Sequence, residues 1–279
     1  MLWLQLLLAA LGLYIIVGVG LALVQTSLLF PTGLAGRGGV YLPATARRIS
    51  VKAADGNILH GVHIPSSASP VGRMLLGFGG NAWNAATLAT LLNELMPGYE
   101  VAVFHYRGYA PSEGKPSAAS LLHDALAVHD GLSDFAPGVP VITIGISIGC
   151  GPAMHLARHR RLSGVILVTP FDSLAALARH HYWWAPVRLL LRHRMEIAAD
   201  AGEVDEPVAI IAAEGDSVVP VERTEALRSK IKRLVFYRAI AHADHNDLYD
   251  RPEFATALSE AASLIKAAGS QRNSSQSLP

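Results

Sequence analysis

The strongest chemical signal in the 279-residue chain is Ser147, which lies in the sequence Gly145-Ile146-Ser147-Ile148-Gly149. The apolar run Val141–Ile146 leads directly into this Gly-x-Ser-x-Gly pattern, and a helix-like segment follows it. A nucleophilic serine needs such a tight strand-to-helix turn, because the flanking glycines let the main chain double back without collisions. The hydroxyl then faces the substrate at the start of a helix, where the helix dipole favours developing negative charge. The pattern therefore predicts that Ser147 is a nucleophile.

A serine hydroxyl is a weak nucleophile unless a base accepts its proton and a carboxylate orients that base. Asp216 follows the apolar run Val208–Ala212, and His245 follows the last such run, Arg233–Ala239. If these runs are parallel strands, their carboxyl ends meet at one edge of the sheet. We therefore expect Asp216 and His245 to lie on loops at the same edge as Ser147.

Two other residues could take these roles. Asp172 follows the preceding apolar run and could supply the carboxylate, and His242 lies three residues before His245. Topology favours Asp216 over Asp172, because Gly215-Asp216 ends the penultimate strand. Spacing alone leaves the choice between His242 and His245 open.

Apolar runs and helical patterns alternate along most of the chain and predict the elements that position these residues. The expected strands are Ile49–Ala53, Ile58–Ile64, Met74–Phe78, Val101–His105, Val141–Ile146, Val165–Val168, Val208–Ala212 and Arg233–Ala239. The expected helices are Ala82–Met96, Ala118–Ser133, Ile148–Arg160, Val221–Ile231 and Pro252–Ala268. Continuously apolar strands indicate burial on both faces. The fold class is therefore α/β, with a mostly parallel, doubly wound sheet, and Asp55-Gly56 adds an N-terminal antiparallel hairpin.

Residues 171–207 form a much longer connection than the short loops that join the other expected strands and helices. The segment contains His180-His181-Tyr182-Trp183-Trp184 and leaves a strand at its carboxyl end, where sheets of this kind bind ligands. A small lid or a wall of the substrate pocket is one interpretation. A structural crossover helix packed by its aromatic side chains is an equally good one.

The 23 residues from Leu2 to Val24 form an almost unbroken apolar run, with Gln5 as the one strongly polar side chain. As a helix this run extends roughly 35 Å, enough to cross a hydrocarbon core of about 30 Å. A cleaved signal peptide fits less well, because the run is too long and no basic residue precedes it. The sequence predicts a single-pass membrane anchor. Arg37, Arg47 and Arg48 weakly favour a cytoplasmic body and leave the sidedness uncertain.

Composition excludes several other classes. The chain carries 23 basic and 22 acidic residues, a net charge of +1, so there is no electrostatic case for nucleic acid. With Cys150 as its single cysteine, the chain has neither an intramolecular disulfide nor a zinc site of several thiolates. His155 and His159 share a helical face, but Leu156 stands where an H-E-x-x-H motif needs its glutamate. We therefore expect no metal and no cofactor.

Several motifs together resemble the membrane-anchored α/β-hydrolase domain proteins, in the branch with bud-emergence-type and lysophospholipase-like members. The resemblance covers roughly residues 28–268. It rests on four segments: Gly79-Gly80-Asn81-Ala82-Trp83-Asn84, the stretch from Tyr106 to Ser117, Thr169-Pro170-Phe171-Asp172-Ser173, and His245-Asn246-Asp247. The resemblance implies the α/β-hydrolase fold, with Ser147 as nucleophile, Asp216 as acid and His245 as base. It favours His245 over His242, because the His-Asn-Asp triplet begins at residue 245.

The resemblance also implies an oxyanion hole formed by the main-chain N–H groups of Asn81 and Ile148. The chain departs from the family pattern at two nearby positions, with Gly79 in place of a histidine and Trp83 in place of a glycine. A main-chain donor does not depend on these side chains, so we expect the oxyanion hole to be retained. The bulk of Trp83 is expected either to narrow the acyl pocket or to cover it, so the substrate size stays open.

Two further residues receive structural interpretations. Arg107 follows a strand and is expected to be a structural hydrogen-bond donor, and Cys150 is expected to be a small buried residue. Four segments are expected along the chain: an anchor (1–26), a linker (27–45), a hydrolase domain (46–268) that includes the candidate lid (171–207), and a disordered tail (269–279).

The expected activity is that of a serine hydrolase, carboxylesterase- or lipase-like, which cleaves a carboxylic ester through an acyl-enzyme. A lipid-like acyl ester or a thioester would suit an enzyme held beside a bilayer. A peptidase or amidase with the same triad is an alternative, as is a non-catalytic hydrolase-fold protein that binds a partner at the membrane. The expected partners are a small-molecule or lipid ester and the membrane, but not nucleic acid.

Overall fold

The computed structural model describes residues 1–35, 41–66 and 72–276, with side chains described up to residue 270. Eight strands form one sheet in the order β1-β2-β4-β3-β5-β6-β7-β8. Their bounds are β1 Arg47–Lys52, β2 Ile58–Ile64, β3 Met74–Phe78, β4 Glu100–Phe104, β5 Val141–Ile146, β6 Gly164–Val168, β7 Val208–Ala213 and β8 Leu234–Ile240. The pairs β1–β2 and β2–β4 are antiparallel, and all the others are parallel. This architecture confirms the predicted fold class.

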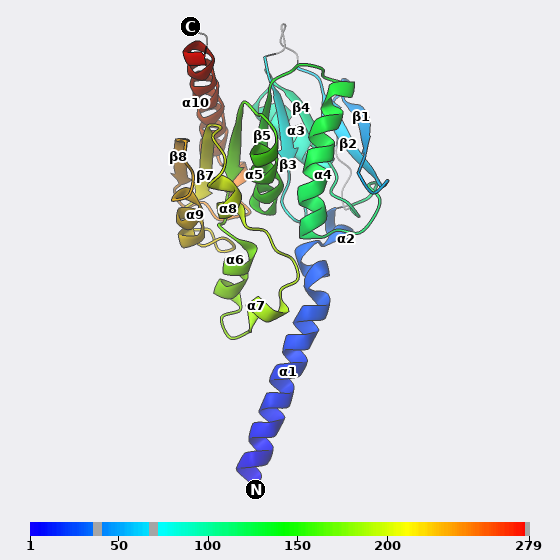
Figure 1. Cartoon of the computed structure of the whole chain (residues 1–279), viewed down its shortest axis with the longest axis vertical. Coiled ribbons are helices and arrows are strands. Elements are labelled where there is room, and N and C mark those ends of the chain that lie inside the picture. Colours follow the sequence, from blue (N-terminus) through cyan, green and yellow to red (C-terminus); the bar gives the residue numbers. More distant parts are fainter. Residues whose placement is uncertain (36–40, 67–71, 277–279) are drawn as a thin grey trace.

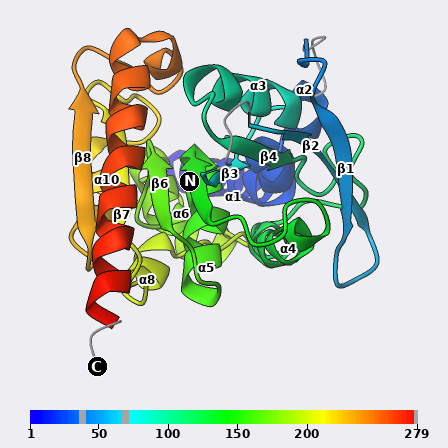
Figure 2. The ribbon, with the colours of Figure 1, turned by 90° about the horizontal axis from the view of Figure 1, so that it is seen from above.

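Helices cover both faces of the sheet, as Figure 2 shows from above. On one face, α3 (Ala85–Leu95) and α10 (Pro252–Gln276) enclose an apolar core with side chains from the strands. On the other face, α4 (Ala118–Asp130), α5 (Cys150–His159) and α9 (Val221–Arg228) enclose a second core. Because both faces are covered, β3, β4, β6 and β7 are buried at every residue. This double cover explains why their sequences are continuously apolar.

Helix ends differ from the sequence prediction where a specific cap decides them. The third helix begins at Ala85 rather than residue 82, because the side chain of Asn84 accepts a hydrogen bond from the Ala86 N–H and caps it. The fourth helix ends at Asp130, and a 3₁₀ turn, η1 (Gly131–Asp134), follows. The last helix continues to Gln276, whereas the sequence predicts a disordered tail over 269–279. No proline interrupts this extension, so the helix propagates from its packed turns. Residues 277–279 lie outside the described residues.

The N-terminal segment is one long helix, α1 (Leu2–Leu29), which extends away from the body in Figure 1. Within the described residues, one helical stretch, Leu2–Ala35, is long and apolar enough to cross a membrane, and only 6% of its most apolar window is buried. The first helix runs three residues beyond the predicted anchor, and a short helix, α2 (Thr32–Ala35), occupies part of the predicted linker. Phe30 between them is buried in the core, which explains why this part of the chain is ordered. Residues 36–40 of the predicted linker lie outside the described residues.

Residues 171–207 form three short helices, α6 (Leu174–His181), α7 (Val187–Leu190) and α8 (Ile197–Ala201). Helix α8 packs on the body, but α6 and α7 lie beyond the edge of the sheet, next to α1 (Figure 1). Several hydrogen bonds join this region to α1. They include the Tyr14 hydroxyl to the Trp184 carbonyl oxygen at 3.0 Å. We call residues 174–190 the α6–α7 segment.

Stability is expected to fall at mildly acidic pH because of His105, which follows β4. Burial lowers the pKa of His105 to about 4, and the neighbouring His60 adds to the shift. In the unfolded chain this pKa returns to its usual value near 6.5, so unfolding takes up a proton between pH 6.5 and 4. The stabilisation is therefore complete above pH 6.5 and is lost as the pH falls towards 4.

Urea unfolding of the full-length protein in detergent, at pH 7 and pH 5, checks this prediction. We expect the free energy of unfolding to decrease less in His105→Gln than in the original protein, by on the order of 1 kcal/mol once solvent screening is allowed for. An equal decrease in both proteins would contradict the assignment to His105.

Candidate active site

Ser147 stands on a strained turn at the carboxyl end of β5. It opens a 3₁₀ turn, η2 (Ser147–Gly149), that leads into α5. Its φ angle is +53°, in the left-handed region that residues other than glycine seldom adopt. Such strain persists only where the surrounding structure enforces it. The predicted strand–turn–helix context of Ser147 is thus present, and its side chain is only partly buried.

The two glycines of the motif are required by close main-chain contacts. A Cβ at Gly149 would lie 2.1 Å from the carbonyl oxygen of Phe78 and 2.7 Å from that of Gly79. A Cβ at Gly145 would lie 2.5 Å from the carbonyl oxygen of Gly149. Backbone atoms cannot yield as a flexible side chain can, so neither position accepts a larger residue. The Ser147 turn therefore packs closely against the end of β3 and the loop that follows it.

A continuous chain of hydrogen bonds joins Ser147, His245 and Asp216. The His245 Nε2 atom is 3.1 Å from the Ser147 Oγ, and its Nδ1 atom is 2.8 and 3.0 Å from the two carboxylate oxygens of Asp216. The His245 and Asp216 side chains are only 9% and 3% exposed. Low exposure weakens competition from water and strengthens both contacts. The three residues singled out in the sequence therefore lie together at one edge of the sheet.

Main-chain donors fix the carboxylate of Asp216. Its Oδ1 accepts hydrogen bonds from the N–H groups of Val218, at 2.9 Å, and Val219, at 2.6 Å. The loop after β7 thus folds around the carboxylate, and Oδ2 makes the shorter of its two contacts with the imidazole, at 2.8 Å. A carboxylate held in this way can keep the imidazole in one orientation and one tautomer.

The loop that carries His245 is held by two further carboxylates. Asp244 accepts hydrogen bonds from the N–H groups of Ser217 and His245, both at 2.7 Å, and so joins the acid and base loops. Asp247 accepts from the Asp244 N–H at 2.7 Å and from Arg251 at 2.6 Å. These donors lower the pKa values of both carboxyls below their usual range. The His-Asn-Asp triplet pointed to Asp247, but no sequence signal singled out Asp244.

The two rivals named from the sequence lie outside this chain of contacts. Asp172 pairs with Arg223, whose Nη1 is 3.2 Å from its carboxylate oxygen. His242 is exposed, and its N–H donates to Glu214 while its carbonyl oxygen accepts from an arginine. The contacts of Asp172 and His242 therefore serve to hold loops together.

Two tyrosines hold the loop that carries Asn81, one of the two expected oxyanion donors. The Tyr106 hydroxyl donates to the Gly79 carbonyl oxygen, and the Tyr109 hydroxyl donates to the Asn81 carbonyl oxygen, both at 2.6 Å. Burial raises the pKa values of both phenols, so each keeps the proton that it donates. The sequence does not predict this role of the Tyr-Arg-Gly-Tyr motif, because nothing in it indicates which carbonyls the phenols reach.

The main-chain N–H groups of Asn81 and Ile148 are the expected oxyanion donors. In the described loops and turns, no main-chain hydrogen bond is made by the Asn81 N–H. Ile148 follows Ser147 directly, and Asn81 lies in the loop that packs against the Ser147 turn. Two main-chain donors on adjoining segments beside a candidate nucleophile are the arrangement that an oxyanion hole requires.

The two departures from the family motif compensate for each other. A Cβ at Gly79 would lie 3.0 Å from the Cβ of Trp83, and one at Gly80 would lie 3.1 Å from the Trp83 ring. The indole therefore occupies space that a side chain at residue 79 would need. Its ring also packs edge-on against Tyr249, with centroids 4.9 Å apart. Trp83 thus packs inside the loop that also carries Asn81.

The structural interpretation of Arg107 is confirmed. Its guanidinium forms two hydrogen bonds to Asp124, at 2.9 and 2.6 Å, and another to Asp55. This arrangement ties the motif that carries both tyrosines to α4 and to the β1–β2 hairpin. The guanidinium also lowers the pKa of Asp55 to about 2.

Cys150 is fully buried beside the Ser147 turn, as expected, and its thiol contacts the carbonyl oxygens of Gly145 and Val168. Burial raises the pKa of this thiol, which makes it unreactive. His155 pairs with Asp200 at a distance of 3.2 Å. Within the described residues, no group of three or more His, Cys, Asp or Glu side chains could hold a metal ion.

Comparison with known proteins gives several relatives, although no family model matches the chain. An uncharacterized protein of Mycobacterium tuberculosis is 35% identical over 211 residues, which cover 73% of this chain and 74% of that protein. The uncharacterized protein YfhR of Escherichia coli is 30% identical over 226 residues, which cover 74% and 78%. Lysophosphatidylserine lipase ABHD12 of Danio rerio is 26% identical over 58% of this chain, which spans half of the length of that lipase.

Solved structures with the same fold include the esterase Pf2001 of Pyrococcus furiosus, with a TM-score of 0.66 and 18% identity. That match covers 80% of this chain and 95% of the esterase. A hydrolase from Pseudomonas aeruginosa has a TM-score of 0.61 and 16% identity and covers 77% and 98%. At these identities the likeness establishes the fold alone.

Replacing Tyr109 by phenylalanine should impair hydrolysis more than folding. The Tyr109→Phe protein loses the donor that fixes the Asn81 carbonyl, so the loop that carries the Asn81 N–H is held less firmly. We expect kcat for a p-nitrophenyl ester to fall about tenfold, equivalent to about 1.4 kcal/mol, with little change in KM. Tyr41→Phe, which alters an exposed tyrosine, is the matched control. A fall in thermal stability with unchanged kcat would contradict a positioning role.

Proposed function

The chain belongs to the α/β-hydrolase superfamily, and from this premise we propose that it is a membrane-anchored serine hydrolase that cleaves carboxylic esters. Ser147 is the nucleophile, His245 the general base and Asp216 the residue that orients the base. The main-chain N–H groups of Asn81 and Ile148 bind the oxyanion. The observation that carries this proposal is the unbroken hydrogen-bond chain from Asp216 through His245 to Ser147.

Acylation begins when His245 Nε2 accepts the proton of the Ser147 hydroxyl as its Oγ attacks the ester carbonyl carbon. Negative charge then develops on the carbonyl oxygen, which the N–H groups of Asn81 and Ile148 stabilise by about 3–4 kcal/mol per donor. Asp216 stabilises the imidazolium that forms, and main-chain donors keep this carboxylate in place. The imidazolium gives its proton to the leaving alcohol, and an acyl-Ser147 ester remains.

Deacylation repeats these steps with water as the nucleophile. His245 accepts a proton from the water, whose oxygen attacks the acyl carbonyl carbon, and the same two N–H groups bind the new oxyanion. Collapse of this intermediate returns the proton from His245 to the Ser147 Oγ and releases the carboxylic acid. The reaction needs only this chain's side chains, its main chain and water.

The anchor and the relatives support a lipid-like acyl ester as the substrate class. The exposed apolar surface of α1 would hold the catalytic domain beside a bilayer, where amphiphilic esters are concentrated. One relative is named a lysophosphatidylserine lipase, and a neighbour in fold is named an esterase. The proposed organisation is an anchor (1–26), a linker (27–45) and a hydrolase domain (46–268).

Hydrolysis of short p-nitrophenyl esters by the full-length protein in detergent tests the proposal. We expect Ser147→Ala to lower kcat by about 10⁴-fold or more and Asp216→Asn by about 10³-fold or more. The matched control Ser229→Ala changes an exposed serine and should retain full activity.

Three results would contradict the proposal. Ester hydrolysis that persists in Ser147→Ala would exclude this serine as the nucleophile. A folded protein that hydrolyses neither esters nor aminoacyl amides would instead indicate a binding protein with a hydrolase fold. Hydrolysis of the amides alone would indicate a peptidase with the same triad.

A further inference from the structure

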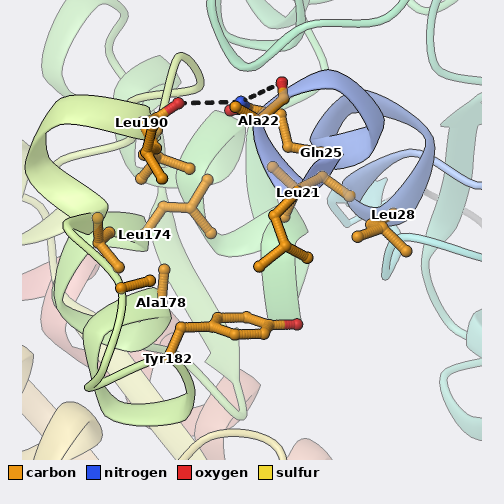
Figure 3. A pocket seen from close by; sticks show the side chains of 12 residues that line it. Leu21, Ala22, Gln25, Leu28, Leu174, Ala178, Tyr182 and Leu190 are labelled. Atoms are coloured by element: carbon orange, nitrogen blue, oxygen red, sulfur yellow. Dashed lines mark hydrogen bonds between the residues drawn. The ribbon is translucent and has the colours of Figure 1, made fainter. Parts of the chain in front are cut away.

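An apolar cavity lies between the N-terminal helix and the α6–α7 segment. Its volume is about 210 Å³. Figure 3 shows Leu21 and Leu28 of α1 on one side, with Leu174 and Ala178 of α6 facing them across the space. None of the residues that line this cavity belongs to the Ser147–His245–Asp216 chain. The cavity is therefore a separate site.

The most polar side chain in this cavity already has its partners. The Gln25 amide nitrogen donates to the carbonyl oxygens of Ala22 and Leu190, at 2.8 and 3.0 Å (Figure 3). Its amide oxygen accepts from the Arg192 N–H at 2.8 Å. Because these bonds use both ends of the amide, Gln25 has little left to offer a polar ligand. The cavity therefore favours an apolar occupant.

The position of the cavity along α1 identifies the source of that occupant. The contacts that α1 makes with the region after α6 begin at Tyr14, whose hydroxyl donates to the Trp184 carbonyl oxygen. They extend to Thr26, whose Oγ1 is 2.8 Å from the His193 Nε2. This stretch of helix is about 18 Å long at 1.5 Å per residue. A hydrocarbon core of about 30 Å takes roughly 20 residues, so a span that begins at Leu2 ends near Leu21. The end of the α6–α7 segment that contacts Tyr14 would then reach into the leaflet nearest the catalytic domain. The cavity itself, lined on α1 by residues from Leu21 to Leu29, would open at the interface of that leaflet.

The side chains at the tip of the α6–α7 segment suit that location. Trp183 is 83% exposed and Leu189 is 85% exposed, and Tyr182 is also exposed. Large apolar side chains at the tip of a protruding segment are costly in water but are stabilised in a membrane interface. Tryptophan and tyrosine in particular concentrate at that depth.

A basic cleft adjoins the apolar cavity. Arg179, Arg188 and Arg194 line it, with Glu196 as its one acidic residue, and it shares Val187 and Leu191 with the cavity. Its volume is about 410 Å³. Within the part of the chain that the structure describes, none of the three arginines forms an ion pair. Unpaired guanidinium groups beside an apolar cavity match the phosphate of an anionic lipid.

We propose that the cavity between α1 and the α6–α7 segment binds one acyl chain of an anionic phospholipid from the bilayer, with its phosphate in the adjoining arginine cleft. The lipid would fasten the α6–α7 segment to the membrane. That segment also contacts the acid loop, because His181 Nε2 lies 2.7 Å from the Val218 carbonyl oxygen, two residues after Asp216. The inference rests on the membrane anchoring in the proposed function but not on the catalytic roles.

Photocrosslinking of the full-length protein in vesicles tests this inference. The probe is phosphatidylglycerol with a diazirine near the end of one acyl chain, and mass spectrometry locates the adducts. We expect adducts on the α6–α7 segment and on the exposed first half of α1. In Ala178→Trp, adducts on the segment should fall at least about fivefold, because an indole fills much of the cavity, while those on α1 persist.

Four further variants and a second lipid probe serve as controls. Ala199→Trp introduces the same side chain at an exposed position on α8 and should leave all adducts unchanged. Ala185→Phe, at another residue that lines the cavity, provides a second filling variant if Ala178→Trp fails to fold. A phosphatidylcholine probe should label the segment several-fold less than phosphatidylglycerol. The double variant Arg188→Gln/Arg194→Gln should remove this difference, whereas Arg48→Gln/Arg161→Gln, with the same loss of charge, should not.

Adducts on α1 without adducts on the α6–α7 segment would overturn the inference and leave the anchoring intact. An absence of adducts on both the segment and α1 would overturn the lipid site and the membrane anchoring. Equal labelling of the segment by the two phospholipids would overturn the assignment of an anionic lipid.

Discussion

At the carboxyl end of β5 the main chain passes so close to the end of β3 that one added carbon at residue 149 would lie 2.1 Å from the Phe78 carbonyl oxygen. This contact holds Ser147 at φ +53° and brings Ile148 beside the loop that contains Asn81. The apolar strands on either side, packed by helices on both faces, keep the two segments from moving apart. Because helices pack on both faces, the sheet is rigid, and this rigidity maintains the strained turn at Ser147.

The remaining parts of the site are loops held by polar contacts rather than by packing. Asp244 joins the loops that carry Asp216 and His245, and Tyr106 and Tyr109 hold the loop that carries Asn81. Each contact is worth only about 1 kcal/mol, but several of them together can fix three loops relative to one strand end. The rigid turn thus positions Ser147, and the fixed loops position the other residues of the proposed site.

Much of this arrangement could be predicted from local patterns, because buried parallel strands leave continuous apolar runs such as Val208–Ala212. The order of those strands places Asp216 and His245 at the edge that carries Ser147. Contacts between distant segments could not be predicted in the same way. Nothing near Tyr109 indicates that its phenol reaches Asn81, and nothing near Gln25 indicates that it binds residues 190 and 192. The helix α10 also extends beyond its predicted end at Ala268, since polar composition alone does not end a helix that has no proline.

The anchor and the candidate active site lie towards the same end of the molecule, since the α6–α7 segment leaves the carboxyl end of β6 and contacts α1 (Figure 1). The most direct test of the account is the reaction of the full-length protein with a fluorophosphonate, with the modified residue mapped by mass spectrometry. We predict one phosphonyl group per chain, on the Ser147 Oγ, and loss of this reaction in His245→Gln. A folded protein that stays unmodified at Ser147, or that reacts equally well without His245, would contradict the account.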